Sequence, residues 1–327
     1  MTAHTKAGWL FCLLSGILAP ASASGSNWEK ELDLKQLKVA NISSQTESLI
    51  QYIKSHTLTP DRRKQIQSLI QRLGDDSWEV RVKASEQLLK IGRLTLPFLN
   101  VALQSKDREV MRRARKITKK MHQAPHRETM VAVVRTLARR QERRALPDLI
   151  ACYASIRDEQ EKLTFQHALM TLGLEQGKPH AVIVDHVHHE DPRVRAVCAL
   201  VLGRAKPLPR KELELLLQDQ DAQARFCAAR SLIRAQDRSA IPVMIDLLSE
   251  MCPQCCWQVE DVLFQVAFST KAPSSLQQFD SASRQKAVES WKSWWDKNLA
   301  SLDLAKSSFD RLLRGYTLYC EYDGGSN

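Results

Sequence analysis

The stretch DPRVRAVCALVLGRA, residues 191–205, begins with an acidic residue and carries apolar side chains at helical spacing. Counting from Asp191, positions +3, +7 and +11 are Val194, Cys198 and Leu202, which lie on one face of a helix. The same pattern occurs in SWEVRVKASEQLLKI from 77, DREVMRRARKITKKM from 107 and DAQARFCAARSLIRA from 221. A helix that recurs with the same face predicts a repeating architecture.

Two independent markers give the period of this repeat. The first is a residue able to cap a helix start, because Ser and Asp side chains accept hydrogen bonds from free amides there. These residues are Ser77, Asp107, Asp158, Asp191 and Asp221. The second is a proline that opens a shorter apolar helix. These prolines are Pro97, Pro147, Pro179, Pro209 and Pro242. Both markers recur about every 30 residues except across 122–145, which predicts stacked helix pairs with one irregularity.

The composition also favours helices. Glycine is scarce, with 11 residues, and aromatic residues make up 6% of the chain, whereas Leu, Ala, Arg, Lys, Glu and Gln are abundant. These abundant residues lose little side-chain freedom in a helix. The predicted fold class is therefore all-α. The weakest repeat unit is the one at Asp158, where Glu161 stands at the apolar position +3.

The N-terminus has the pattern of a secretory signal peptide at 1–23. Lys6 precedes an apolar run at 8–19, and small residues follow at 21–23. The apolar run has 12 residues, fewer than the roughly 20 that span a bilayer. We therefore expect cleavage after Ala23 and an exported protein, periplasmic or secreted, with no transmembrane segment in the mature chain.

The repeat helix resembles the D-x-x-V-R-x-x-A helix of HEAT-repeat, or armadillo-like, α-solenoids in their short bacterial form. The resemblance covers roughly 62–268, and the units at 107 and 158 depart from it. The segments DRRKQIQSLIQRLGDDSWEVRVKASEQLLKIG and WKSWWDKN are similar to those of exported bacterial HEAT-repeat proteins of largely uncharacterised role. The resemblance implies a right-handed superhelical scaffold whose second helices line a concave face, and it implies no activity.

These observations divide the chain into segments. The expected order is a signal peptide at 1–23, a linker at 24–43, an N-terminal capping helix at 44–61, a HEAT-repeat solenoid at 62–270, Trp-rich capping helices at 271–310 and a β-rich segment at 311–327. The final segment is predicted from the β-prone run 316–322 and the turn signal at 323–325. It is interpreted either as the start of a second module or as a short strand attached to the last helix.

Positive charge is concentrated in one part of the chain. The net charge is +11, and residues 106–144 contain 14 Lys or Arg against four acids. The candidate binding residues are Arg112, Arg113, Arg115, Lys116, Lys119, Lys120, Arg135, Arg139, Arg140, Arg143 and Arg144. Such a field attracts acidic partners. The alternative is a solvated face that keeps the protein soluble. Nucleic acid is disfavoured because no aromatic residue in this segment can stack on bases.

Two further motifs invite a chemical interpretation. His186 and His189 lie three residues apart on a predicted helix and are a weak candidate for zinc, which needs more ligands and supporting contacts. The alternative is an exposed turn, and no metal site is predicted. In MCPQCCW, a local disulfide from Cys252 to Cys255 or Cys256 is plausible in an oxidising compartment.

No catalytic motif is present in the sequence. We find no nucleophile elbow, P-loop, H-E-x-x-H or G-x-G-x-x-G pattern. The expected function is therefore a non-enzymatic scaffold without a cofactor that binds a protein partner, favouring an acidic one, with envelope polymers or lipid headgroups as alternatives. Some proteins that this chain resembles are bilin lyases or act on DNA bases, so an enzyme is the rival hypothesis. A spacer that presents a C-terminal β-rich domain is the third.

Overall fold

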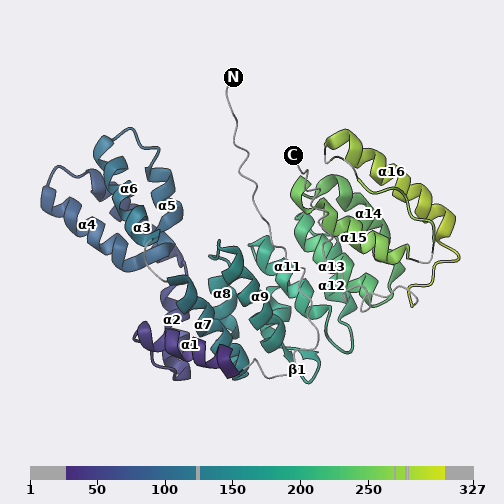
Figure 1. Ribbon diagram of the computed structural model, residues 1–327, viewed down its shortest axis with the longest axis horizontal. Helices are drawn as coiled ribbons and strands as arrows, with labels where there is room; N and C mark the ends of the chain where they lie inside the picture. The colour runs from purple at the N-terminus through teal and green to yellow at the C-terminus, as the bar shows by residue number, and fades with distance from the viewer. Residues whose placement is uncertain (1–26, 123–125, 269, 277, 279, 306–327) are drawn as a thin grey trace, which may run out of the picture.

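The computed structural model describes residues 27–122, 126–268, 270–276, 278 and 280–305, which form an all-α fold (Figure 1). The expected signal peptide at 1–23 and β-rich segment at 311–327 lie outside these residues. The helices are α1 (Asn27–Val39), α2 (Thr46–Ser55), α3 (Pro60–Gln71), α4 (Trp78–Ile91), α5 (Leu96–Ala102), α6 (Arg108–His122), α7 (His126–Arg139), α8 (Leu146–Tyr153), α9 (Glu159–Leu172), α10 (Ala181–Asp185), α11 (Pro192–Leu202), α12 (Arg210–Leu217), α13 (Ala222–Arg234), α14 (Ile241–Glu250), α15 (Cys256–Val266) and α16 (Ser281–Asn298). An antiparallel pair of two-residue strands, β1 (Leu174–Glu175) and β2 (Lys178–Pro179), follows α9 and was not expected.

The predicted acidic caps explain where the template helices begin. Asp107 Oδ1 accepts hydrogen bonds from the amides of Glu109 and Val110 at 2.8 and 3.2 Å. Asp158 and Asp221 each accept two such bonds, and Asp191 accepts one, at the starts of α9, α13 and α11. Ser77 does precede α4 as predicted, but its side chain makes no capping bond, so that part of the prediction was wrong. The Ser77 amide donates to Asp75 Oδ1 at 2.9 Å.

The predicted inward face of the repeat helix is confirmed by burial. The residues at position +7 are all at most 2% exposed, and they are Ala84, Ala114, Phe165, Cys198 and Ala228. Four of these five residues are small, which allows neighbouring helices to approach closely. Template helices of successive units pack on one another, α4 on α6, α9 on α11 and α11 on α13, and α14 packs on α13, α15 and α16.

The helices bury two separate hydrophobic cores. Helices α3 to α6 enclose one core, with Ile66, Leu88 and Ile117 at its centre, and we call residues 60–122 the lobe. Helices α1, α2 and α7 to α16 enclose the other core, and we call them the main stack. Figure 1 shows the lobe standing apart from the row of helices that runs from α1 to α16. Helix α6 belongs to the core of the lobe and α7 to the core of the main stack, so the chain passes from one core to the other near the irregularity predicted at 122–145.

The N-terminal segments differ from their expected roles. The segment 24–43, expected as a linker, contains helix α1. The capping helix expected at 44–61 does form as α2. It packs on α7 and α8, which are distant in sequence, and not on the helices α3 to α6 that come directly after it. Its apolar residues Leu49 and Ile53 belong to the core of the main stack. The chain therefore begins in the main stack, leaves it to form the lobe, and returns at α7.

Glu161 interrupts the apolar pattern because it connects the lobe to the main stack. Its carboxylate, on α9, lies 3.5 Å from the guanidinium of Arg93, which precedes α5 in the lobe. The Glu161 side chain is only 10% exposed. The amide of Leu58 also donates to Ser155 Oγ at 3.3 Å. A charged residue at a repeat position is thus explained by a contact between segments distant in sequence.

In three of the repeat units an arginine at template position +4 links the unit to the next one. Arg195 donates to the backbone carbonyls of His189 and Glu190 at 2.8 and 3.1 Å. It also binds both carboxylate oxygens of Asp219, in the next unit, at 2.6 and 2.7 Å. Arg81 and Arg225 repeat this arrangement, with Glu109 and Glu250 as the acids. The acid that each of these arginines pairs with therefore belongs to the following unit.

Gly203, directly after α11, lies against Ser231 of α13, and we predict that alanine there is destabilising. A Cβ at this residue would lie 2.1 Å from Ser231 Oγ and 2.4 Å from Ser231 Cβ. Gly203→Ala should therefore lower the free energy of unfolding by about 1–3 kcal/mol, the usual cost of overpacking. Urea denaturation measures this. Because Ser231→Gly removes the clashing atoms, the double variant should lose less stability than the two single effects combined. Additive effects would show that the helices separate freely.

Candidate functional site: a basic row on the lobe

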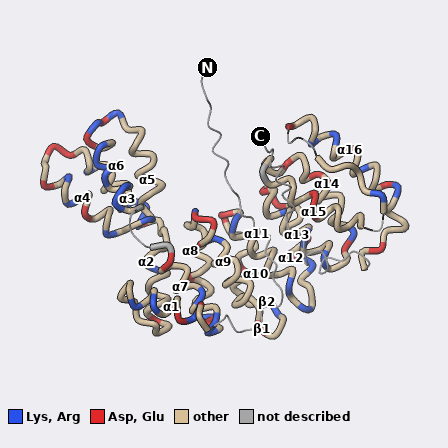
Figure 2. The backbone as a smooth tube through the Cα atoms, viewed as in Figure 1, with Lys and Arg blue, Asp and Glu red and all other residues tan. Residues whose placement is uncertain are grey.

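Helix α6 has one buried face and one basic face. Its apolar residues fill the core of the lobe at spacings of four, three and four, and they are Val110, Ala114, Ile117 and Met121. The opposite side carries five exposed cations at spacings of three, one, three and one: Arg112, Arg115, Lys116, Lys119 and Lys120. We call these five residues the α6 basic row. Figure 2 shows Lys and Arg along α6 in the lobe.

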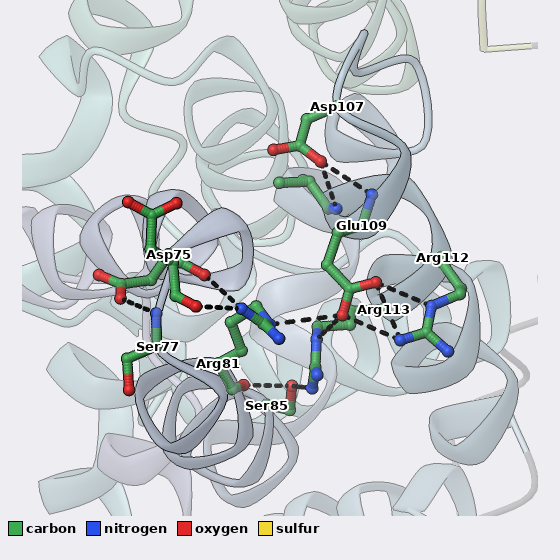
Figure 3. A network of polar contacts seen from close by, with 10 residues as sticks. Asp75, Ser77, Arg81, Ser85, Asp107, Glu109, Arg112 and Arg113 are labelled. Carbon is green, nitrogen blue, oxygen red and sulfur yellow. Dashed lines mark hydrogen bonds and ion pairs between the residues drawn. The ribbon is translucent and has the colours of Figure 1, made fainter.

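One end of the row is anchored by Glu109, as Figure 3 shows. The Glu109 carboxylate accepts hydrogen bonds from Arg112 at 2.9 Å and from Arg113 at 2.6 Å, and Arg81 lies 3.5 Å away. The bonds from Arg112 and then Arg113 lower the pKa of Glu109 to about 2, so it remains charged at any physiological pH. Arg113 also lies 3.4 Å from Ser85 Oγ and is only 13% exposed. It is therefore a structural residue, whereas Arg112 remains 72% exposed.

The other members of the row are unneutralised. Arg115, Lys116, Lys119 and Lys120 are exposed, and among the residues that the structure describes none of them makes an ion pair. Eight residues separate the ends of the row, which corresponds to about 12 Å along a helix. The row is therefore a short linear array of positive charge on a rigid element.

The predicted basic residues on and after α7 make contacts within the main stack instead. Arg135 and Arg139 lie 3.5 and 2.7 Å from the buried carboxylate of Asp33 on α1. Arg144 lies 3.5 Å from Glu47 on α2 and from Glu142. Arg140 and Arg143 donate to the backbone carbonyls of Ser44 and Leu174. The segment 106–144 thus divides between two cores, and only its first half forms an open basic surface.

The stack also gathers cations that the sequence analysis did not single out. His167 on α9, Arg204 after α11 and Arg230 on α13 all have a lowered pKa, first through burial and then through nearby positive charge. For His167 that charge is Arg204, and for both arginines it is Arg234. These residues occupy template positions +9 and +13 of three successive units, so an alignment of the units by their caps would have found them.

The candidate histidines His186 and His189 lie close together in the turn before α11. The rings of His186 and His189 are stacked with centroids 5.7 Å apart. His189 Nδ1 accepts a hydrogen bond from the Asp191 amide at 3.0 Å, and His186 Nδ1 lies 2.7 Å from the Val182 carbonyl oxygen. No group of three or more metal-ligating side chains occurs among the described residues. The pair is explained as part of the turn before α11.

The cysteines of MCPQCCW divide into a disulfide and a buried thiol. Cys252 and Cys255 are joined, which is one of the two pairings that the sequence allowed. Cys256 is fully buried, and its Sγ lies 3.3 Å from the Leu248 carbonyl oxygen. Burial raises the pKa of the Cys198 thiol to about 12 and that of the Cys227 thiol to about 11. These thiols are protonated and pack in the core, so they are not nucleophiles.

In the part of the chain that the structure describes, none of the helices is both long and apolar enough to cross a membrane. No known protein family matches the sequence, and no curated protein has a significantly similar sequence. The α6 basic row is therefore assessed by its own geometry and charge.

Proposed function

We propose that this protein is a non-enzymatic interaction scaffold of the HEAT-repeat type that binds an acidic segment of a partner protein along the α6 basic row. The observation that supports this is the set of four exposed, unneutralised cations on one helix face, Arg115, Lys116, Lys119 and Lys120. The proposal includes export of the chain from the cytoplasm, which the signal-like segment at 1–23 supports.

A linear peptide suits the row better than a membrane or a nucleic acid. Helices that bind lipid surfaces insert an apolar face into the bilayer. The apolar face of α6 is already occupied by the core of the lobe, including Ala114 and Ile117. Single-stranded nucleic acids are held by aromatic stacking as well as charge, and residues 106–144 contain no aromatic side chain. An acidic peptide needs only the charges that the row offers.

The central prediction concerns the four cations without ion pairs. Changing Arg115, Lys116, Lys119 and Lys120 together to Gln should weaken binding of a poly-glutamate peptide by at least about tenfold, because each exposed ion pair contributes a few tenths of a kcal/mol or more. Fluorescence anisotropy at low salt measures the affinity. Binding to the native chain should weaken steeply as salt is added, since exposed charges are screened within about 10 Å at 0.1 M salt.

The matched control removes the same charge elsewhere. Lys178, Lys211, Lys271 and Lys286 are also exposed, and they lie outside the lobe, on β2, on α12, between α15 and α16, and on α16. Changing these four to Gln should leave peptide affinity unchanged at a given salt concentration. Equal losses in both variants would mean that only net charge matters, and the proposed row would be wrong. Anionic vesicles and single-stranded DNA are included as ligands, and preferential, row-dependent binding of either would replace the acidic peptide as the partner class.

A further inference from the structure

Helix α1 lies at one end of the main stack (Figure 1). It presents a stripe of apolar side chains to solvent. Trp28, Leu32 and Val39 are 63%, 52% and 70% exposed. With Lys35 they occupy positions i, i+4, i+7 and i+11, which is the spacing of a seam between two helices. Large apolar side chains arranged as a continuous exposed stripe usually mark an interaction surface.

The opposite side of α1 is attached to α7 largely by polar contacts. The buried carboxylate of Asp33 lies 2.7 Å from Arg139. Gln36 Nε2 donates to Thr129 Oγ1 at 3.3 Å, and Leu37 is buried beside these groups. These contacts fix the rotation of α1 about its axis. The apolar stripe therefore faces outward because charged and hydrogen-bonding groups hold the other face inward.

The other end of the main stack is closed by a helix with a polar outer face. Helix α16 buries Ala287, Val288, Trp291 and Trp294 and exposes polar residues such as Lys292. Terminal units of helical repeats need a polar outer face of this kind. Helix α1 differs, because it buries Asp33 beside Leu37 on its inner side and carries large apolar residues on its outer side. Its outer face is thus an apolar surface that nothing in the described stack covers.

We infer that a second copy of this chain covers the stripe, with the two α1 helices packed antiparallel about a twofold axis. In that arrangement Trp28 faces Val39 of the second copy, and Leu32 faces Lys35 of the second copy. The methylene stem of a lysine can cover an apolar neighbour while its ammonium group reaches water. Each residue of the stripe therefore meets a compatible residue, as a self-complementary twofold interface requires.

Charge complementarity selects both the partner and the orientation. Glu31 and Lys38 are exposed on the open flank of the stripe, and neither makes an ion pair within the described residues. In the antiparallel pair, Glu31 of each copy lies beside Lys38 of the other, which gives two opposite-charge contacts. A parallel pair would instead place Glu31 level with Glu31. The charges on α1 thus favour the antiparallel copy.

The contact is small. Helix α1 has 13 residues, so a pair of them buries less than the roughly 1,200 Å² typical of stable complexes. The expected product is a weak, reversible dimer with micromolar affinity. This inference is independent of the proposed function, because the α6 basic row lies in the lobe and takes no part in the contact.

The first test is sedimentation equilibrium of the full chain, purified from a host that processes its N-terminus, over two decades of concentration. The native chain should reach twice the monomer mass at the upper end. Trp28→Glu should remain monomeric. Trp78→Glu is the matched control, because Trp78 is also 63% exposed but lies on α4 in the lobe, and this variant should still dimerise. A native chain that stays monomeric, or a Trp28→Glu variant that still dimerises, overturns the inference.

A second test distinguishes a copy of the chain from any other partner. Lys38→Glu alone places two acids beside each other across the twofold axis, and Glu31→Lys alone places two lysines there. Each variant should be monomeric, whereas an equimolar mixture of the two should dimerise, because every contact again joins opposite charges. Circular dichroism confirms that both variants are folded. Failure of the mixture to associate would overturn the antiparallel arrangement.

Discussion

Trp291→Ala is expected to lower the free energy of unfolding of the main stack by about 3–5 kcal/mol, as removal of a large buried aromatic residue does. Trp291 is fully buried in α16. Its ring packs edge-on against those of Phe264 and Trp294, with centroids 5.4 and 5.3 Å away. Because α16 closes the C-terminal end of the stack, the loss should also expose α14 and α15. Chemical denaturation followed by circular dichroism measures the effect.

The two separate cores provide the control for this prediction. Leu88→Ala empties a fully buried position in the lobe, where the cost should be about 2–5 kcal/mol. If the cores unfold as separate units, each variant should shift one transition and leave the other in place. Proteolysis followed by mass spectrometry identifies which segment opens first. A single transition that both variants shift equally would show that the lobe and the main stack unfold together.

Arg195→Met is expected to destabilise the main stack by about 3–5 kcal/mol, because it leaves a largely buried carboxylate without its cation. The side chains of Arg195 and Asp219 are 17% and 8% exposed. Two short hydrogen bonds join them, and two further bonds connect Arg195 to the carbonyls before α11. Met keeps the length of the apolar stem, so the effect reports the lost charge and hydrogen bonds. Urea denaturation at neutral pH measures it.

The destabilisation by Arg195→Met should depend on pH, because the Arg195–Asp219 ion pair requires the carboxyl group of Asp219 to be ionised. Burial alone would raise the pKa of Asp219. The hydrogen bonds from Arg195 and from the Asp221 amide, together with the positive charges of Arg195 and Arg225, outweigh burial and lower the pKa below that of a free aspartate. The stabilisation is therefore complete above about pH 4, near the unfolded pKa. It is lost as pH falls through the folded pKa, so the native chain and the variant should converge in acid. Arg112→Met, on an exposed pair, is the control and should change stability little. A difference that persists unchanged at low pH would contradict this explanation.

Much of the local structure could be predicted from the sequence because it depends on neighbouring residues. An aspartate before an apolar run caps a helix through its own following amides, as Asp107 and Asp221 do. The apolar spacing identified the buried face before any contact was known, and Ala84 and Cys198 lie on it. Ser77 does precede helix α4 as expected, but its side chain makes no capping bond, and nothing in the structure explains why.

The candidate site could be predicted only in part. The sequence located the positive charge in 106–144, and the exposed half of it on α6 follows from helical spacing. The acids that engage the other half are distant in sequence, since Asp33 and Glu47 belong to α1 and α2. A local charge count cannot include them. His167 and Arg204 come from successive units that stacking brings together, and a local charge count misses them too, although an alignment of the units by their caps would have found them.

The sequence by itself determined the all-α class, the helix starts and the inward face of each repeat, because these follow from hydrogen bonds and apolar spacing within a single helix. Only the tertiary structure decided that α1 and α2 join α7 and α8 across the intervening lobe, and that Glu161 meets Arg93. In each case several helix faces are equally apolar, or several side chains are equally charged, so the sequence does not show which of them are in contact. The contacts depend on which surfaces fit together in three dimensions, and that information is distributed over the whole chain.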